Sequence, residues 1–167
     1  MSNEETPIAE ENSPIFQLQK LYVKDISFEN PNAPQIFVES QNQLNIEFSL
    51  ALNNQRVDDE HWEVSLKINI VAHDKGCDKN VFEIEVEHAG IFVLRNIPEE
   101  HVTVVLAVEC PTIIFPYTRQ IISQATVDGG FMPFLMEPVN FRAVYEGKLQ
   151  QEATEAAEAN KGMLPKS

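Results

Sequence analysis

WEVSLKINI (Trp62–Ile70) has an apolar residue at every second position and a polar or charged one between. A period of two is typical of a β-strand with one buried face, because successive side chains point to opposite sides of a sheet. The buried side is predicted to consist of Trp62, Val64, Leu66, Ile68 and Ile70.

The same alternation occurs on both sides of this stretch. QLNIEFSLAL (Gln43–Leu52) and VFEIEVE (Val81–Glu87) repeat it, and polar turns short enough for antiparallel neighbours connect the three segments. YVKDISFENPNAP (Tyr22–Pro34) is expected to be a fourth strand, whose apolar row is interrupted by two lysines and whose end is set by two prolines.

Helical patterns follow the strands. HVTVVLAVECP (His101–Pro111) has the β-branched content of a strand, but Asn96 and Glu99 have the spacing of a helix cap, and we expect a helix. TIIFPYTRQIISQATVDGG (Thr112–Gly130) has helical spacing, with a proline expected near its start or at a kink, and another helix is expected to begin near Asn140. The prediction is an α+β fold, a four-stranded antiparallel sheet with C-terminal helices on one side.

With 167 residues, 43% of them hydrophobic, the chain is long enough for one domain. We expect this domain over residues 15–151. Residues 1–14 are expected to form a disordered acidic arm, and residues 152–167 a flexible tail with almost no apolar face.

Net charge limits the partners. At −14, the chain should repel nucleic acid and anionic membranes and attract a basic protein. The N-terminus lacks the features of a secretory signal, no stretch approaches eighteen apolar residues, and the cysteines have no disulfide spacing. These observations predict a cytoplasmic protein that does not insert into membranes.

Four segments in order, YVKDISFENPNAP, AGIF, CPTIIFPYTR and PVNF, resemble the SecB family of protein-export chaperones of Gram-negative bacteria. The resemblance covers about Phe16 to Gln151. It implies a homotetramer built as a dimer of dimers and ATP-independent holding of unfolded precursor proteins. It also implies delivery to the motor protein SecA, whose basic, zinc-bearing C-terminal tail docks on an acidic surface of the sheet.

The SecA-binding carboxylates of the family match Asp25, Glu29 and Glu85. The first two lie on the same side of a strand, roughly 13 Å apart. Glu83 and Glu87 would widen the patch if the two strands are neighbours, although family members tend to be less acidic at the position of Glu83. The alternative is that these carboxylates only keep the sheet soluble.

The client-binding groove of the family is walled by the loop after the long helix, the last helix and the segment after the first strand. A precursor presents apolar side chains in no fixed order, so adaptable apolar area suits it. One proline of the loop is displaced from the family pattern by Met132, and on pattern alone the three strand residues would belong to the core. The matching residues are Leu44, Ile46, Phe48, Phe131, Met132, Phe134, Leu135, Met136, Phe141, Val144 and Tyr145.

The sequence gives little support for an enzyme, a cofactor or a metal site. The Walker A position before Gly147-Lys148 is occupied by Arg142, so a phosphate-binding loop is absent. His73 and Cys77 have ligand-like spacing, but two ligands do not make a zinc site. The remaining alternative is a β-sheet carrier for a small apolar ligand.

Overall fold

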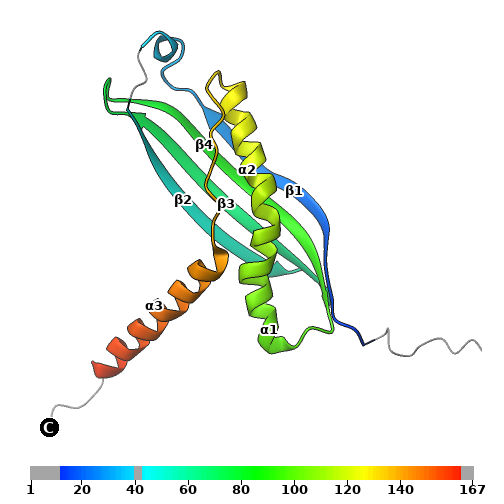
Figure 1. The fold of residues 1–167 in the computed structure, drawn as a ribbon. Helices are drawn as coiled ribbons and strands as arrows, with labels where there is room; N and C mark the ends of the chain where they lie inside the picture. The colour runs from blue at the N-terminus through cyan, green and yellow to red at the C-terminus, as the bar shows by residue number, and fades with distance from the viewer. Residues whose placement is uncertain (1–11, 40–42, 163–167) are drawn as a thin grey trace, which may run out of the picture.

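The computed structural model describes residues 12–39 and 43–162. Four strands form one antiparallel sheet in the order β1-β4-β3-β2, and the helices follow in sequence (Figure 1). The elements are β1 (Ile15–Glu29), the 3-10 turn η1 (Gln35–Phe37), β2 (Leu44–Arg56), β3 (His61–Asp74), β4 (Lys79–Arg95), α1 (Glu99–Val104), the π-helical segment η2 (Val105–Glu109), α2 (Cys110–Asp128) and α3 (Phe141–Lys161).

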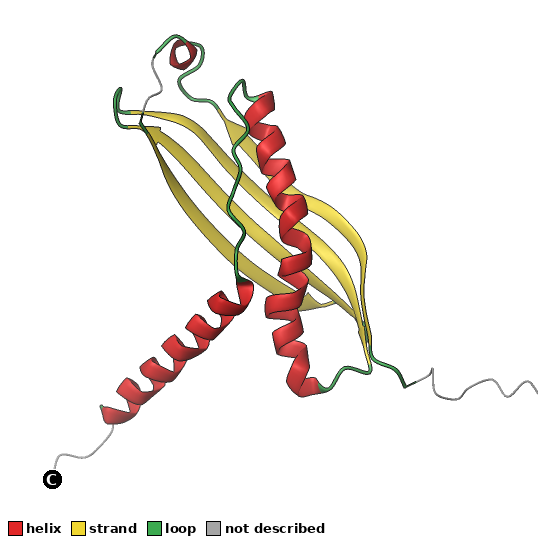
Figure 2. Ribbon diagram, viewed as in Figure 1, coloured by secondary structure: helices red, strands yellow, loops and turns green. Residues whose placement is uncertain are grey.

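The domain has two layers, with the sheet on one side and the long helix on the other (Figure 2). Val64 to Ala72 of β3 are fully buried at every second position, as the alternation predicts, and β4 adds Ile84 and Val86 to the same face. The inner side of α2, including Ile114 and Ile122, packs on this face. The α+β prediction is confirmed.

β1 is longer than the sequence suggested and contains two irregularities. Its register with β4 shifts between Leu18 and Lys20 and again between Val23 and Asp25. A bulge rotates the following side chains to the other face, which explains why lysines appear to interrupt the apolar row. After Glu29 the prolines end the ladder as expected, and the fully buried Ile36 anchors the crossover to β2.

The segment His101–Pro111 is helical, as expected, but its start differs from the prediction. The helix begins at Glu99 after Pro98, whereas Asn96 has a positive φ of 55° in the turn, so the predicted cap is wrong. Pro116 lies inside α2 rather than near its start. The π-helical segment η2 lies directly before α2, whose second residue is Pro111, a residue without a backbone N–H donor.

By length and composition alone, the helical run Glu99–Asp128 is long and apolar enough to cross a membrane. The sequence expectation concerned a stretch of about eighteen apolar residues, and this run is not one, because Glu109, Thr112 and Thr118 interrupt it. Core helices of globular proteins share this length and composition. Here the inner side of the run packs on the sheet.

α3 begins after Asn140, whose side chain accepts a hydrogen bond from the Ala143 amide at 3.1 Å, as a helix cap does. The helix continues to Lys161, past the boundary at Gln151 that the sequence predicts for the domain. Residues 152–161 form exposed helix that projects from the domain (Figure 1). Residues 1–11 of the predicted arm and residues 163–167 of the predicted tail lie outside the described residues.

One polar pair lies inside the core between the layers. His88 of β4 is buried, and its Nδ1 lies 2.8 Å from Oγ1 of Thr118, which in turn donates to the Ile114 carbonyl. Burial lowers the pKa of His88, so its imidazole is neutral near pH 7. This pair satisfies polar groups that would otherwise be buried without partners.

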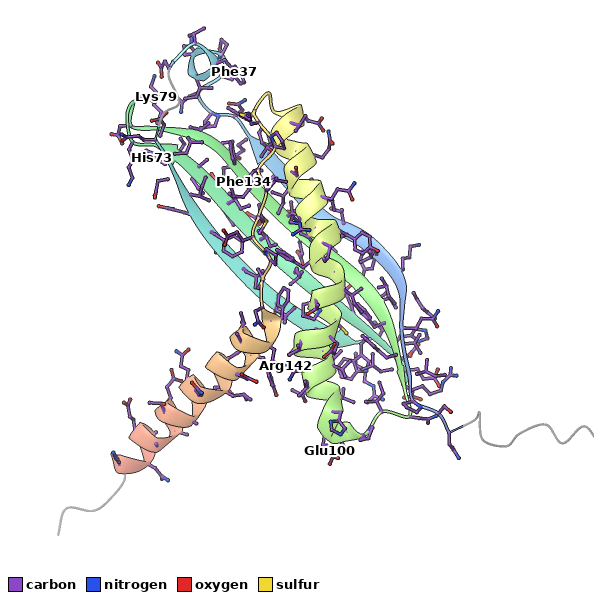
Figure 3. All side chains as sticks on the ribbon, in the orientation of Figure 1. Phe37, His73, Lys79, Glu100, Phe134 and Arg142 are labelled. Carbon is purple, nitrogen blue, oxygen red and sulfur yellow. The ribbon has the colours of Figure 1, made fainter. Side chains whose placement is uncertain are left out.

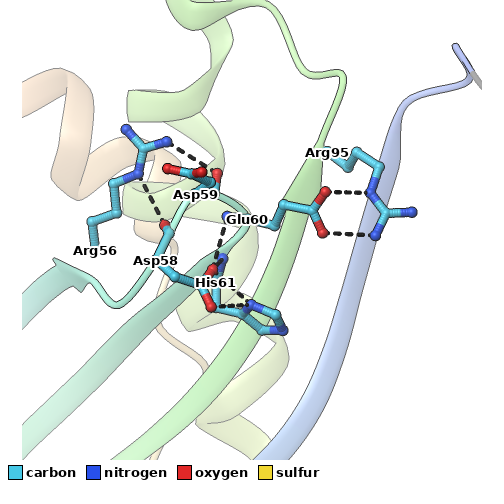
Figure 4. A network of polar contacts seen from close by, with 6 residues as sticks. All are labelled: Arg56, Asp58, Asp59, Glu60, His61 and Arg95. Carbon is cyan, nitrogen blue, oxygen red and sulfur yellow. Dashed lines mark hydrogen bonds and ion pairs between the residues drawn. The ribbon is translucent and has the colours of Figure 1, made fainter.

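Polar contacts hold the β2–β3 turn against the end of β4 (Figure 4). The Asp58 carboxylate accepts the backbone N–H groups of Glu60 and His61 at 2.9 and 2.8 Å. Glu60 receives two hydrogen bonds from Arg95, at 2.9 and 2.7 Å. Arg56 donates to the backbone carbonyls of Asp58 and Asp59.

The hydrogen bonds to Asp58 lower the pKa of its carboxyl group from 3.8 to about 2, chiefly through the Glu60 amide and then through the His61 ring. We expect Asp58→Ala to lower the melting temperature by about 3 °C, because two backbone donors lose their acceptor. Because the folded-state pKa is depressed, the contribution of Asp58 is complete above pH 4 and disappears as the pH falls through about 2.

Thermal melts of the wild type and variant from pH 2 to pH 7 measure this difference. Asp59→Ala is the matched control, because Asp59 contacts Arg56 through its backbone carbonyl, which alanine keeps. Equal losses in the two variants would contradict the role given to the Asp58 carboxylate.

Candidate functional site

Five carboxylates form an acidic patch on the sheet face that points away from the helices: Asp25, Glu29, Glu83, Glu85 and Glu87. β1 and β4 are direct neighbours, which was the condition for these residues to form one surface. Asp25 pairs with Glu87 and Glu29 with Glu83, while Glu85 pairs with Ser27 between them. Paired positions on neighbouring strands lie about 5 Å apart, so the patch concentrates negative charge.

Two lysines border the acidic patch. Lys67 of β3 lies opposite Glu87, and its Nζ is 2.9 Å from Oε1 of Glu85. Lys24 of β1 pairs with Glu63 at 2.9 Å, and Glu63 also accepts the Tyr22 hydroxyl. Sequence reasoning did not connect Lys67 with the patch, although the alternation of WEVSLKINI places it on the polar face.

The apolar row of β2 lies on the opposite face of the sheet. Leu44, Ile46 and Phe48 are 47%, 37% and 47% exposed, so the alternative that assigned them to the core is wrong. They extend the buried face of β3, since Phe48 pairs with Ile70 there. β2 is the edge strand farthest from β1, and α2 contacts β3 and β4, so this row remains open on the helix side.

The loop after α2 divides the predicted client residues into two groups. Phe131 lies 5.2 to 6.5 Å, ring centroid to centroid, from Phe28, Phe37 and Phe82, and Phe134 packs near Phe82. Met136 is buried, and Phe131 and Phe134 are half-buried, so these three loop residues fix the path of the loop over the sheet. Met132 and Leu135, in contrast, are 86% and 73% exposed.

The path of the loop is also set by polar contacts. Thr126 of α2 accepts the Phe131 amide through its carbonyl at 3.0 Å and the Phe134 amide through its hydroxyl at 2.9 Å. In Figure 3, Phe134 lies on the stretch that crosses the helix side of the sheet. The exposed loop side chains therefore project from a fixed segment.

The predicted residues of α3 also divide. Phe141 is buried, with its ring 5.9 Å from that of Phe115, so it anchors the helix. Val144 and Tyr145 line a cleft of about 680 Å³ between α3, the α1–η2 region and β2. Sequence reasoning did not assign to the site several residues of this cleft, among them Leu50, Leu52, Trp62, Val102, Leu106 and Leu149.

The sequence contained an apolar pattern that pointed to most of these cleft residues. Leu50, Leu52 and Trp62 lie on apolar strand faces, and Leu149 lies on the apolar stripe of the last helix. Val102 and Leu106 belong to the segment whose strand or helix state was ambiguous, so their position next to β2 could not be predicted.

The crossover after β1 adds apolar surface at one end of the sheet. Phe37 is 46% exposed and Val38 is 87% exposed. Glu39, next along the chain, forms an ion pair with Lys79 of β4 at 2.9 Å. Figure 3 shows Phe37 and Lys79 at the same end of the domain.

Neither cysteine is activated as a nucleophile. Burial raises the pKa of Cys110 to about 12, with a smaller contribution from Glu109, and burial also raises the pKa of Cys77. His73 is hydrogen-bonded to Asn80 and Asp78. Within residues 12–39 and 43–162, no group of three or more His, Cys, Asp or Glu could hold a metal ion.

An open apolar surface on one side of a sheet and an acidic patch on the other are typical of a chaperone-like binding protein. The family model for the preprotein translocase subunit SecB matches residues 9–152. The chain belongs to the SecB family of protein-export chaperones.

Two curated relatives are similar in sequence to this chain over most of their length. The protein-export protein SecB of Desulfotalea psychrophila is 57% identical over 145 residues, which cover 86% of this chain and 92% of the relative. That of Magnetococcus marinus is 43% identical over 157 residues, which cover 93% and 98%.

A solved structure has a similar fold. It is a SecB-like chaperone of Mycobacterium tuberculosis in complex with a ChAD peptide from an antitoxin. The TM-score is 0.58 at 17% identity, and the match covers 74% of this chain and 90% of that one. At this identity the comparison supports the fold alone.

Proposed function

We propose that this chain is a holdase that binds unfolded precursor proteins in the cytoplasm without ATP and delivers them to SecA. The observation that carries the proposal is the open apolar row of β2, continued by the exposed loop residues Met132 and Leu135. Such surface attracts non-native polypeptides, because burying one large apolar side chain contributes about 1.5–3 kcal/mol.

We assign client binding to the exposed members of the predicted set: Leu44, Ile46, Phe48, Met132, Leu135, Val144 and the half-buried Tyr145. The other members of the predicted set pack into the domain beneath this surface and hold it in place: Phe131, Phe134, Met136 and Phe141. A methionine-containing surface can repack around varied client side chains.

We assign SecA docking to the acidic patch. Its negative charge complements the basic, zinc-bearing tail expected for SecA, and it lies on the other side of the sheet from the β2 row. A homotetramer, arranged as a dimer of dimers, would multiply weak client sites and raise their effective concentration.

Exposed apolar residues support assembly. Phe16, Val23 and Ile26 on the edge strand β1, and Tyr117 and Val127 on α2, are 38–50% exposed. Their burial between subunits would leave the β2 row free, because β1 and β2 form opposite edges of the sheet.

A small apolar ligand is the second candidate, because the cleft beside α3 has the size of ligand pockets. Light scattering and calorimetry together separate the two functions. We expect a mass of four chains, binding of an unfolded precursor at about micromolar concentration, and no binding of the same precursor when folded. A monomer that binds a lipid-like molecule tightly and ignores unfolded precursors would favour the carrier.

A further inference from the structure

Lys67 lies beside the centre of the acidic patch. Positions Asp25, Glu87 and Lys67 form one cross-strand row over β1, β4 and β3, and Ser27, Glu85 and Asn69 form the next row. Lys67 therefore has carboxylates on two neighbouring rows within its reach, and its side chain is 49% exposed.

Lys67 forms an ion pair with one of these carboxylates, that of Glu85. Its Nζ lies 2.9 Å from Oε1 of Glu85, at a diagonal position, although Glu87 is directly opposite in the ladder. The pKa of Lys67 is raised, chiefly by the hydrogen bond to Glu85, with smaller contributions from Glu87 and Asp25. The ammonium group is thus charged and interacts with three members of the patch.

The other nearby lysine is held differently. Lys24 pairs with Glu63, which lies outside the acidic patch and is also bonded to Tyr22 and Gln55. Opening the Lys24 pair would release Glu63, whereas opening the Lys67 pair would release Glu85, a member of the patch. Lys67 is therefore placed to compete for the carboxylate that a basic partner needs.

We propose that Lys67 is an internal competitor of the basic partner, which occupies Glu85 in the free protein and is displaced by a lysine or arginine of that partner in the complex. The inference rests on the proposed docking of SecA at the acidic patch. An exposed ion pair is weak enough to exchange, because solvent screens it and holding two long side chains together costs entropy. Lys67 thereby weakens docking and keeps it reversible.

The test measures binding of the zinc-loaded C-terminal tail peptide of SecA to the full-length protein by calorimetry. Lys67→Met is expected to tighten binding about fivefold at low ionic strength, and the gain should shrink as salt is added. In a Glu85→Gln background the same change should give no more than the gain from net charge, because the contested carboxylate is absent.

Lys75→Met is the matched control, since it removes the same charge from an exposed turn position about 26 Å along the strand from Lys67. Lys67→Gln replaces the methionine variant if that variant does not fold, as judged by thermal melting. An equal gain from Lys75→Met, or no gain from either Lys67 variant, would overturn the role of Lys67.

The docking proposal fails in a different way. If Asp25→Asn with Glu29→Gln weakens peptide binding while the Lys67 variants bind like the wild type, docking stands and the competitor role is wrong. If the wild type does not bind the peptide at all, the proposed docking site is wrong and the inference falls with it.

Discussion

Replacing Leu44, Ile46 and Phe48 together by alanine is expected to weaken retention of an unfolded precursor about 100-fold. Each side chain is 37–47% exposed, so a bound client can cover roughly half of its surface. Covering that half contributes about 1 kcal/mol per residue, or about 3 kcal/mol for the three, which corresponds to roughly two orders of magnitude in affinity. Calorimetry with an unfolded precursor measures the loss.

The control for this variant lies on the same strand. Asn45, Glu47 and Ser49 alternate with the three apolar residues and point to the other face of β2, so their replacement by alanine tests a general effect on the strand. The apolar variant should melt a few degrees lower and remain folded at 25 °C, because the side chains are only partly buried. A folded apolar variant that holds clients like the wild type would disprove the assignment.

The strands could be predicted from the sequence, but their neighbours could not. Alternation states which side chains share a face, as for Val64, Leu66 and Ile68, and the structure confirms this. It does not state that β1 pairs with β4, because pairing depends on the crossover through η1 and on long-range packing. Once the pairing of β1 with β4 is known, the five carboxylates can be placed on one surface, the acidic patch.

Burial on the helix side was less predictable for the same reason. The pattern of β2 resembles that of β3, yet Ile46 is exposed and Ile70 is fully buried, because α2 lies over β3 and β4. A loop has no period, so the sequence could not separate the buried Met136 from the exposed Met132. The hydrogen bonds of the Phe131 and Phe134 amides to Thr126 and the ring contacts of Phe131 fix the loop path that produces this difference.

Residues 101–110 are helical although their local propensity favours a strand, because tertiary packing decides their conformation. Valine-rich segments favour strands, but here Leu106 and Val108 are buried in a helix that continues into α2. The capping signal at Asn96 favoured the correct element for the wrong reason, since Asn96 lies in the preceding turn. The packing of a long helix on a sheet can override the strand propensity of such a segment.

The largest effect on partner docking is expected from neutralising the acidic patch. Asp25→Asn, Glu29→Gln and Glu85→Gln together should weaken SecA binding about 50-fold at low ionic strength, because three charge pairs with the basic partner are lost. Client retention should be unchanged, since the β2 row lies on the opposite face. The thermal stability should rise slightly, because like charges on paired strands repel.

The control variant carries the same change in net charge at another place. Asp59→Asn, Glu99→Gln and Glu100→Gln alter exposed positions in the β2–β3 turn and the first turn of α1. We expect this variant to lose far less SecA affinity, because the patch is intact and only the overall charge of the protein has changed. An equal loss would mean that SecA recognises net charge rather than this surface. A joint loss of client and SecA binding in the patch variant, with the oligomer intact, would mean that the two functions share one surface.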